Sequence, residues 1–363
     1  LITAHHLVVD GVSWRILLPD LVAAWAGAEL EPVPTSFRRW AQKLNAEAAN
    51  PERRAAEAPL WREIEQTPDP ALASRALDPG TDTFGTARHL TVELPADVTG
   101  PLLTDVPAAF HARVNDVLLT ALAVAVADWR DDPGTAVLVD LEGHGREEIV
   151  PGVELSRTVG WFTSVFPVAL DAGAVSRSEV ERGGEAAGTA LKRVKEQLRR
   201  IPDNGIGFGL LTAGGEQADR ADPAGSRRTP QIAFNYLGRT AAAEDGDADW
   251  SPAGPDDNAA LAAGQDDALG LVHAVEVNAH TRVLPSGPVL SATWTYAGGL
   301  FGEDRIRALA DRWTGALRGL AAHVTEGAGG GFTPSDLSLV EIDQDEIDEL
   351  AAEFDDLSDW ELD

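Results

Sequence analysis

The 363-residue chain contains neither cysteine nor methionine. The absence of cysteine excludes disulfides, thiolate catalysis and cysteine-based metal sites. No stretch approaches the roughly 18 consecutive apolar residues of a membrane helix, and no basic-then-apolar signal segment opens the chain. We therefore expect a soluble, cytoplasmic protein with no membrane partner. Because residue 1 is a leucine and not a methionine, we also expect the chain to be a piece of a longer reading frame.

Basic residues are scarce. There are 29 Lys and Arg against 59 Asp and Glu, which gives a formal net charge of −30. Nucleic acid is excluded as a partner, because nothing neutralises its phosphates. Residues 336–363 hold 13 acidic and no basic residues, so we expect this tail to be separate from the body. The 44% of hydrophobic residues are enough for a sizeable core.

Strand-like and helix-like patterns alternate along the chain, which predicts an α/β or α+β class. The predicted strands are residues 1–4, 88–94, 135–142, 164–170, 231–237, 271–283 and 289–297. The predicted helices are residues 15–25, 37–49, 113–129, 178–200 and 304–324. Segments 67–86, 212–230 and 239–268 are rich in Gly, Pro and polar residues and are expected to be irregular.

Two polar segments follow predicted strands. His5 and His6 come directly after the first strand, and Asp10 and a glycine follow four residues later. On an extended strand the two imidazoles point to opposite faces, so only one reaches a given site. In a pair of this kind the ordinary expectation is one core and one exposed histidine. Metal-ligand spacing is absent.

The second polar segment is LEGHGREE (141–148), in which Glu142, His144 and Arg146 alternate with glycines. It is either a solvated hairpin turn or a functional turn with close backbone approach. The functional interpretation is favoured because Glu142 directly follows the apolar run AVLVDL, so its carboxylate is expected to be partly buried.

Five motifs then occur in the order found in one known family. HHLVVDGVSWRIL (5–17) resembles the histidine motif of the condensation-like superfamily of nonribosomal peptide synthetases, with the Val-Ser-Trp ending typical of epimerization domains. LEGHGREE resembles the glutamate motif of epimerization domains. RTVGWFTSVFPVAL (157–170), IPDNGIGFG (201–209) and FNYLG (234–238) are similar to the motifs that follow, with Phe208 where tyrosine is more usual.

The resemblance implies an α+β sandwich of two chloramphenicol-acetyltransferase-like lobes that form a V. The family's domain begins well over a hundred residues before the histidine motif, so we expect an N-terminally truncated chain with an incomplete first lobe. The expected divisions are residues 1–80 for the remainder of the first lobe, 81–335 for the second lobe and 336–363 for an acidic C-terminal docking tail.

The implied reaction is the L-to-D epimerization of an aminoacyl or peptidyl thioester on a peptidyl carrier protein. The domain has no cofactor of its own, because the substrate is carried on phosphopantetheine and a thioester acidifies its α-proton. By motif, His6 and Glu142 are the acid and base, and which of the two deprotonates the L-substrate stays open. Asn235 and Tyr236 are either donors to the enolate oxygen or stabilisers of a β-bulge.

Other residues near the motifs are expected to be structural. They are His5, Asp10 and Arg146, with Arg146 as the expected cation for Asp10. The tail is either a solubilising segment or an acidic amphipathic helix that binds a downstream condensation-bearing subunit; the resemblance favours the second. The alternatives to an epimerase are a peptide-bond-forming condensation domain and a non-catalytic scaffold of the same superfamily. The identity of the inverted amino acid stays open.

Overall fold

The computed structural model describes residues 2–132, 134–213, 229–241, 266–327, 329–337, 339–340 and 342–350. Most of the two predicted polar loops 212–230 and 239–268 lies outside these residues. The described residues form one six-stranded sheet with strand order β1-β6-β5-β4-β2-β3. The strands are β1 (Ala87–Leu94), β2 (Ala136–Gly143), β3 (Ser164–Asp171), β4 (Ile232–Ala241), β5 (Val275–Leu284) and β6 (Gly287–Ala297).

The sheet is mixed. β5, β4 and β2 run parallel to one another, and the β1–β6, β6–β5 and β2–β3 pairs are antiparallel. Parallel neighbours need crossover connections, so α/β packing follows directly from the strand order. The predicted α/β class is therefore confirmed. Each of the six strands predicted after residue 80 is present.

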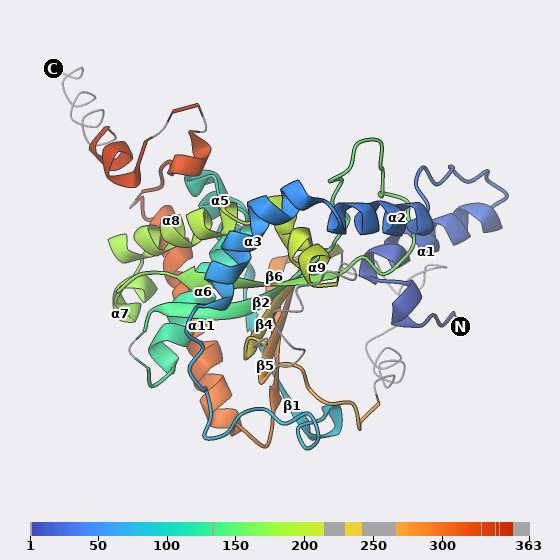
Figure 1. Cartoon of the computed structure of the whole chain (residues 1–363). Helices are drawn as coiled ribbons and strands as arrows, with labels where there is room; N and C mark the ends of the chain where they lie inside the picture. The colour runs from blue at the N-terminus through green and yellow to red at the C-terminus, as the bar shows by residue number, and fades with distance from the viewer. Residues whose placement is uncertain are drawn as a thin grey trace.

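Helices cover one face of the sheet (Figure 1). Three of them, α1 to α3, precede the first strand in the sequence, and α11 follows the last strand. The α-helices are α1 (Gly11–Trp25), α2 (Phe37–Ala48), α3 (Pro51–Glu65), α4 (Ala96–Leu103), α5 (Asp105–Phe110), α6 (Val114–Trp129), α7 (Arg177–Glu181), α8 (Glu185–Arg199), α9 (Ile206–Ala213) and α11 (Glu303–Thr325). The 3-10 turns are η1 (His6–Val8), η2 (Phe84–Thr86), η3 (Pro202–Gly205) and η4 (Pro334–Asp336).

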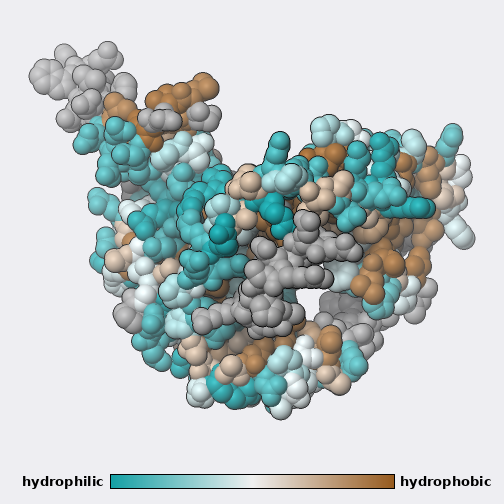
Figure 2. Space-filling view, in the orientation of Figure 1, coloured by the Kyte–Doolittle hydropathy of each residue, from teal (hydrophilic) through white to brown (hydrophobic). Residues whose placement is uncertain are grey.

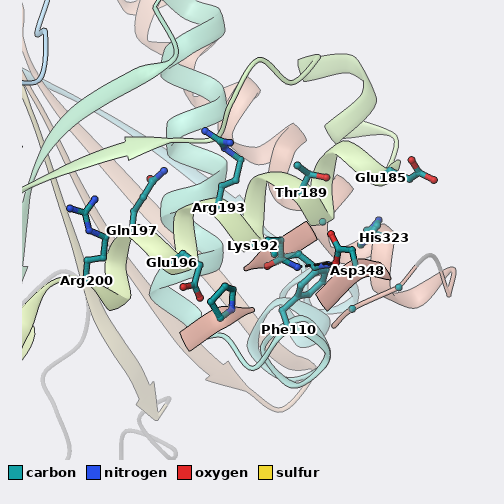
Figure 3. Close-up of a pocket in the computed structure, with 15 residues that line it drawn as sticks. Phe110, Glu185, Thr189, Lys192, Arg193, Glu196, Gln197, Arg200, His323 and Asp348 are labelled. Carbon is teal, nitrogen blue, oxygen red and sulfur yellow. Dashed lines mark hydrogen bonds and ion pairs between the residues drawn. The ribbon is translucent and has the colours of Figure 1, made fainter. Parts of the chain in front are cut away.

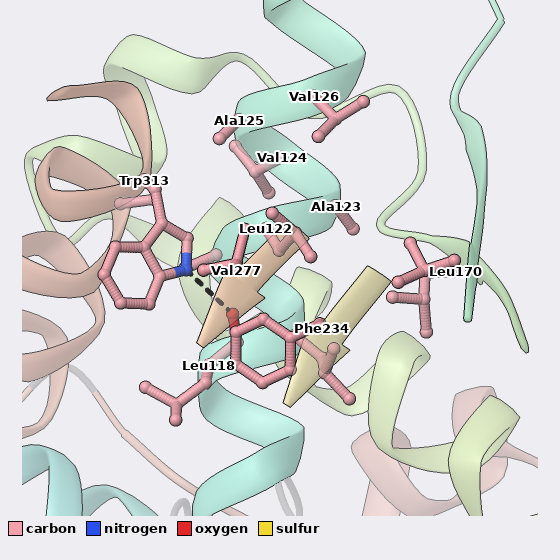
Figure 4. Close-up of a cluster of buried hydrophobic side chains, with 14 of the residues drawn as sticks. Leu118, Leu122, Ala123, Val124, Ala125, Val126, Leu170, Phe234, Val277 and Trp313 are labelled. Atoms are coloured by element: carbon pink, nitrogen blue, oxygen red, sulfur yellow. Dashed lines mark hydrogen bonds between the residues drawn. The ribbon is translucent and has the colours of Figure 1, made fainter. Parts of the chain in front are cut away.

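The core lies between the sheet and α6, α8 and α11. α6 is apolar on nearly all sides and is almost completely buried, as expected of a central helix. Figure 4 shows its side chains packed toward Phe234 of β4, Val277 of β5 and Trp313 of α11. The Trp313 indole N–H donates to the Leu118 carbonyl at 3.1 Å, which satisfies the polar atom of a fully buried ring.

The N-terminal helix α1 has several exposed apolar side chains. Figure 2 shows hydrophobic residues at the surface on the right of the view, where Figure 1 places α1. Leu18, Val22 and Trp25 are exposed there, and Trp25 reaches 80% exposure. In the described residues, α1 therefore has an apolar surface that the sheet and its helices do not cover.

The opposite face of the sheet is polar. Along β5, Val275, Val277 and Ala279 are buried, whereas the alternating residues Glu276 and Asn278 are half-buried. Because successive side chains of a strand point to opposite faces, one face of β5 belongs to the core and the other presents polar groups. This polar face carries the candidate site.

The predicted strand at residues 1–4 is wrong. Residues 2–5 are without regular structure, and His6–Val8 form the turn η1. A strand needs a neighbour for its backbone groups. Here the bonds are local instead, since Val8 N donates to the His5 carbonyl at 3.0 Å and Leu7 N to His5 Nδ1 at 3.1 Å. The alternation argument for His5 and His6 therefore does not apply.

The predicted helix 178–200 is two helices, α7 and α8, which meet at Gly183 and Gly184. Gly183 has φ +72°, and a Cβ there would lie 2.9 Å from the His323 backbone nitrogen of α11. The close approach of α11 and the left-handed backbone together break the helix. Within the described residues 2–80, α1, α2 and α3 are present and no strand is found. The division at residue 80 stays a prediction.

Candidate active site

A cavity of about 920 Å³ lies at the end of β2 and beside the middle of β4, and its lining includes residues of β5, α6 and α8. Glu142 lines it from β2, Asn235 and Tyr236 line it from β4, and Asp10 and Arg15 line it from the start of α1. Segments more than a hundred residues apart in the sequence thus meet at one hollow. Three of the four predicted catalytic residues are among its lining residues, and His6 is not.

Glu142 is the half-buried carboxylate of this cavity. Asn235 Nδ2 donates to Glu142 Oε2 at 2.7 Å, which fixes the carboxyl group across the β2–β4 pair. Burial raises the pKa of Glu142 above its ordinary value, and the nearby Glu276 carboxylate raises it further; His273 and His6 partly oppose this. A carboxyl group with a raised pKa exchanges protons closer to neutral pH, which is what an acid or base catalyst needs.

Tyr236 and Asn235 precede an irregularity in β4. The β4–β5 register shifts between Tyr236 and Arg239, and Gly238 has φ +78°. The expected β-bulge is therefore present. The Tyr236 hydroxyl lies 2.9 Å from Thr281 Oγ1 of β5, whereas the amide of Asn235 is bonded to Glu142. Tyr236 thus connects β4 to β5 beside the bulge, and Asn235 holds the Glu142 carboxyl group.

His6 lies on the N-terminal side of this region. Its exposed ring packs edge-to-face on Trp161, with centroids 5.1 Å apart. It is close enough to Glu142 for its charge to lower the pKa of that carboxyl group. His5 is also exposed, and its Nδ1 accepts from Leu7 N within its own turn. Both histidines are therefore exposed, and the expectation of one core and one exposed histidine is wrong.

Asp10 and Arg146 form the expected ion pair. Arg146 Nη1 and Nη2 donate to the two carboxylate oxygens of Asp10 at 2.6 and 3.0 Å, and both side chains are buried. Asp10 also caps α1 by accepting from Ser13 N and Ser13 Oγ at 2.7 and 2.8 Å. The Arg146 guanidinium lies 4.1 Å from the Phe162 ring centroid. This clamp joins the N-terminal segment to the loop after β2.

The loop itself is held at Gly145. Its φ is +64°, and a Cβ there would lie 1.6 Å from the Phe162 carbonyl oxygen. Neither the backbone conformation nor the space admits a side chain at this position. The alternation of glycines in LEGHGREE, which the sequence left as either a solvated or a functional turn, therefore reflects close backbone approach beside Arg146.

We expect Asp10→Ala to destabilise the protein by about 3–5 kcal/mol, because it leaves the Arg146 charge buried without its partner. Burial alone would raise the pKa of Asp10, but the hydrogen bonds from Arg146 and Ser13 outweigh it and lower the pKa. The contribution of Asp10 is thus present above its unfolded pKa of about 4 and is lost as pH falls through the lower folded value.

Urea denaturation at pH 7 and at pH 3 measures both effects. His5→Ala is the control, since an exposed side chain with one local bond is worth within about 0.5 kcal/mol. Equal losses for the two variants at pH 7 would contradict the assignment of Asp10 as the buried clamp.

Several residues of the cavity were not predicted. His280 and Arg282 line it from β5, and Arg113 and Asn204 line its other side. Arg113 Nη1 donates to Asn204 Oδ1 at 3.0 Å, and Asn204 adopts φ +48°. The alternation V-E-V-N-A-H within the predicted strand 271–283 was the signal for β5, because it places every second polar residue on one face.

A second hollow of about 560 Å³ lies between α8 and the start of the C-terminal tail, away from Glu142 (Figure 3). The tail does not stand apart from the body there. Asp348 pairs with Lys192 Nζ at 2.7 Å, Asp336 pairs with the fully buried Lys195, and Ile347 is buried. The expectation of a separate tail is therefore wrong for its described part. The part of the predicted amphipathic helix from residue 351 on lies outside the described residues.

The part of the chain that the structure describes contains no group of three or more His, Asp or Glu that could hold a metal ion. Within the same residues no single helix is long and apolar enough to cross a membrane. Only Ala96–Phe110 taken together with Val114–Trp129 reaches that length and composition, with a bend of 100° between them.

The chain resembles known proteins over nearly its whole length. The Condensation domain family matches residues 1–338. One of the linear gramicidin synthase proteins from Brevibacillus parabrevis is 38% identical over 96% of this chain, and chondramide synthase cmdD from Chondromyces crocatus is 39% identical over 95%. The chain spans only 4% and 8% of the lengths of these two proteins.

Solved structures show the same fold. The epimerization domain from the third module of tyrocidine synthetase B is 33% identical, with a TM-score of 0.72 over 89% of this chain and 68% of that chain. The X-domain from teicoplanin biosynthesis has a TM-score of 0.59 at 20% identity, over 88% of this chain and 68% of that one. At that lower identity the likeness extends to the fold alone.

Proposed function

Because this chain belongs to the Condensation domain family, whose members act on carrier-bound substrates within multidomain synthetases, we propose that it epimerizes the α-carbon of an aminoacyl or peptidyl thioester. One observation carries the proposal: the half-buried carboxyl group of Glu142, held by Asn235, lines a large cavity and has a raised pKa. The 33% identity to an epimerization domain supports it.

The chemistry requires one proton to leave the α-carbon and another to return on the opposite face. A thioester carbonyl stabilises the resulting enolate better than an amide does, so the domain uses no cofactor of its own and the substrate arrives on phosphopantetheine. Glu142 exchanges a proton with the α-carbon, and burial raises its pKa in the direction that an acid–base catalyst needs. Asn235 orients the carboxyl group and donates toward the developing negative charge.

His6 is the proposed second acid–base group. Its imidazole approaches from the N-terminal side of the cavity, and Glu142 approaches from the sheet, so the two groups come from different elements. Inversion needs either two groups on opposite faces or one group and water. His6 is outside the lining of the cavity, so its contribution is tested separately from that of Glu142.

The assay loads a carrier protein with an L-aminoacyl or L-peptidyl thioester and incubates it with the protein in deuterated water. Epimerization gives a D/L mixture with deuterium at the α-carbon, measured by mass spectrometry and chiral chromatography of the released acid. A condensation domain instead forms a peptide when a second, acceptor-loaded carrier is present. Peptide formation without α-deuteration would replace the proposal with the condensation activity, and neither product would favour the scaffold.

The proposed partners are an upstream peptidyl carrier domain and a downstream condensation-bearing subunit that binds the tail. Asp336 and Asp348 of the described tail pair with α8, and we propose residues 351–363, which carry six acidic residues and no basic one, as the partner-binding segment. Deleting 351–363 is expected to leave deuterium exchange unchanged and to abolish transfer to the partner subunit, with weaker transfer at high salt. Unchanged transfer after the deletion would leave the segment with a solubilising role only.

A further inference from the structure

Two carboxylate–amide pairs lie side by side on the polar face of the sheet. Asn235 Nδ2 donates to Glu142 on β2, and on the next strand Asn278 Nδ2 donates to Glu276 Oε1 at 2.5 Å. The parallel β4–β5 register places Asn235 directly beside Asn278. The two amides therefore occupy neighbouring positions, and each holds one glutamate.

Glu276 is two strands away from Glu142 in the order β5-β4-β2. Glu276 is also two residues back along the register, level with Asp140, so at about 4.8 Å per strand and 3.3 Å per residue the two Cα atoms are roughly 12 Å apart. Both side chains are half-buried, so solvent screens their repulsion less than it would between exposed groups. Glu276 does not line the cavity, whereas Glu142 does, so a substrate in the cavity meets only one of the two carboxylates.

Several other titratable groups around Glu142 lie in close pairs. Arg15 from α1 and Arg113 before α6 are cationic residues of the cavity, and His6 faces Glu142 from the N-terminal segment. The pairs are Asp10 with Arg146, Asp116 with Arg199, Asp140 with His273 and His144 with Glu147. Farther along β5 the cavity includes His280 and Arg282, and Arg282 pairs with Glu93.

We propose that Glu276, held by Asn278, is a positioning residue whose negative charge acts on the Glu142 carboxyl group across β4. This inference deepens the proposed function, since it assumes that Glu142 is the acid–base group. Repulsion from Glu276 is the second cause of the raised pKa of Glu142, after burial. Glu276 thus supports the chemistry without touching the substrate.

The test is the titration of Glu142 itself, followed by ¹³C NMR of the intact protein labelled at glutamate Cδ. The Glu142 signal is the one missing from Glu142→Gln. Glu276→Gln keeps the size of the side chain and an oxygen that accepts from Asn278, so it removes only the charge. Its expected effect is to lower the Glu142 midpoint by about 0.3 to 1 pH unit at low salt, with a smaller shift at high salt.

Two controls separate charge from distance and shape. Glu326→Gln removes an exposed carboxylate directly after α11, outside the lining of the cavity, and is expected to leave the midpoint unchanged. Glu276→Asp keeps the charge and is expected to keep most of the elevation. Equal midpoints in the parent, Glu276→Gln and Glu326→Gln would overturn the proposal. Because the readout is a titration and not turnover, this result is independent of whether the protein proves to be an epimerase.

Discussion

Replacing Glu142 with glutamine is expected to slow α-proton exchange and inversion of the carrier-bound substrate by about 10²- to 10⁴-fold. Glutamine has the same shape and retains an oxygen that accepts from Asn235, so the β2–β4 pairing and the cavity persist. What is lost is the ability to take and return a proton. The measurement is deuterium incorporation at the α-carbon in single-turnover conditions, beside a thermal unfolding curve.

Glu148→Gln is the matched control for this variant. Glu148 lies in the same motif, is exposed and does not line the cavity, so its substitution is expected to leave the exchange rate within about twofold. If Glu142→Gln exchanges deuterium at the parent rate, Glu142 is not the acid–base group. A separate variant, His6→Ala, tests the second acid–base group. A loss of exchange rate similar to that of Glu142→Gln supports His6, whereas an exchange rate equal to the parent's indicates that Glu142 works with water.

Asp336→Asn is expected to destabilise the protein by about 3–5 kcal/mol, because it leaves the fully buried Lys195 without an opposite charge. Asparagine keeps an oxygen for Thr333 N, which donates to Asp336 Oδ2 at 2.9 Å, so the loss is mainly electrostatic. Burial alone would raise the pKa of Asp336, but hydrogen bonds from Lys195 and Thr333 outweigh it and lower the pKa. Urea denaturation at neutral pH measures the loss.

Asp348→Asn is the matched control, because Asp348 also pairs with a lysine of α8. Asp348 is 53% exposed and pairs with Lys192, so this pair is expected to contribute about 0–1 kcal/mol. Similar small losses for the two variants would show that the junction of body and tail is not anchored at Lys195. The outcome also decides where a tail deletion should begin. A deletion that begins at residue 336 removes the Asp336–Lys195 ion pair together with the segment proposed to bind a partner.

The local sequence was sufficient for most elements of the second half of the chain. A segment could be predicted where its apolar residues recur with a regular period or fill the whole segment. Examples are the strands 88–94 and 289–297 and the helices 113–129 and 304–324. The short helices α4 and α5 were not predicted, since a segment of six to eight residues gives no clear period. α3 was also missed, although Asn50 before Pro51 is a helix-start signal.

The candidate site divides in the same way. The motifs were enough to identify Glu142, Asn235 and Asp10 as candidate site residues, because residue types and their order along the chain can be seen without a structure. The pairing of Asp10 with Arg146 was expected from the motifs, but only the tertiary structure decided that Asn235 holds Glu142 and that Glu276 stands two strands away. These relations depend on strand order and register, which are fixed by packing between distant segments and leave no local trace in the sequence.

The ends of the chain show the same limit. The apolar run at residues 1–4 carries the pattern of a strand, yet the described residues there pair with no neighbour, and hydrogen bonding within η1 decides the conformation. The acidic composition of residues 336–363 indicated a separate tail, yet Asp336 is fixed because Lys195, far away in sequence, is buried beneath it. Composition and period determine what a segment can form by itself, and tertiary contacts decide which backbone groups and charges find partners.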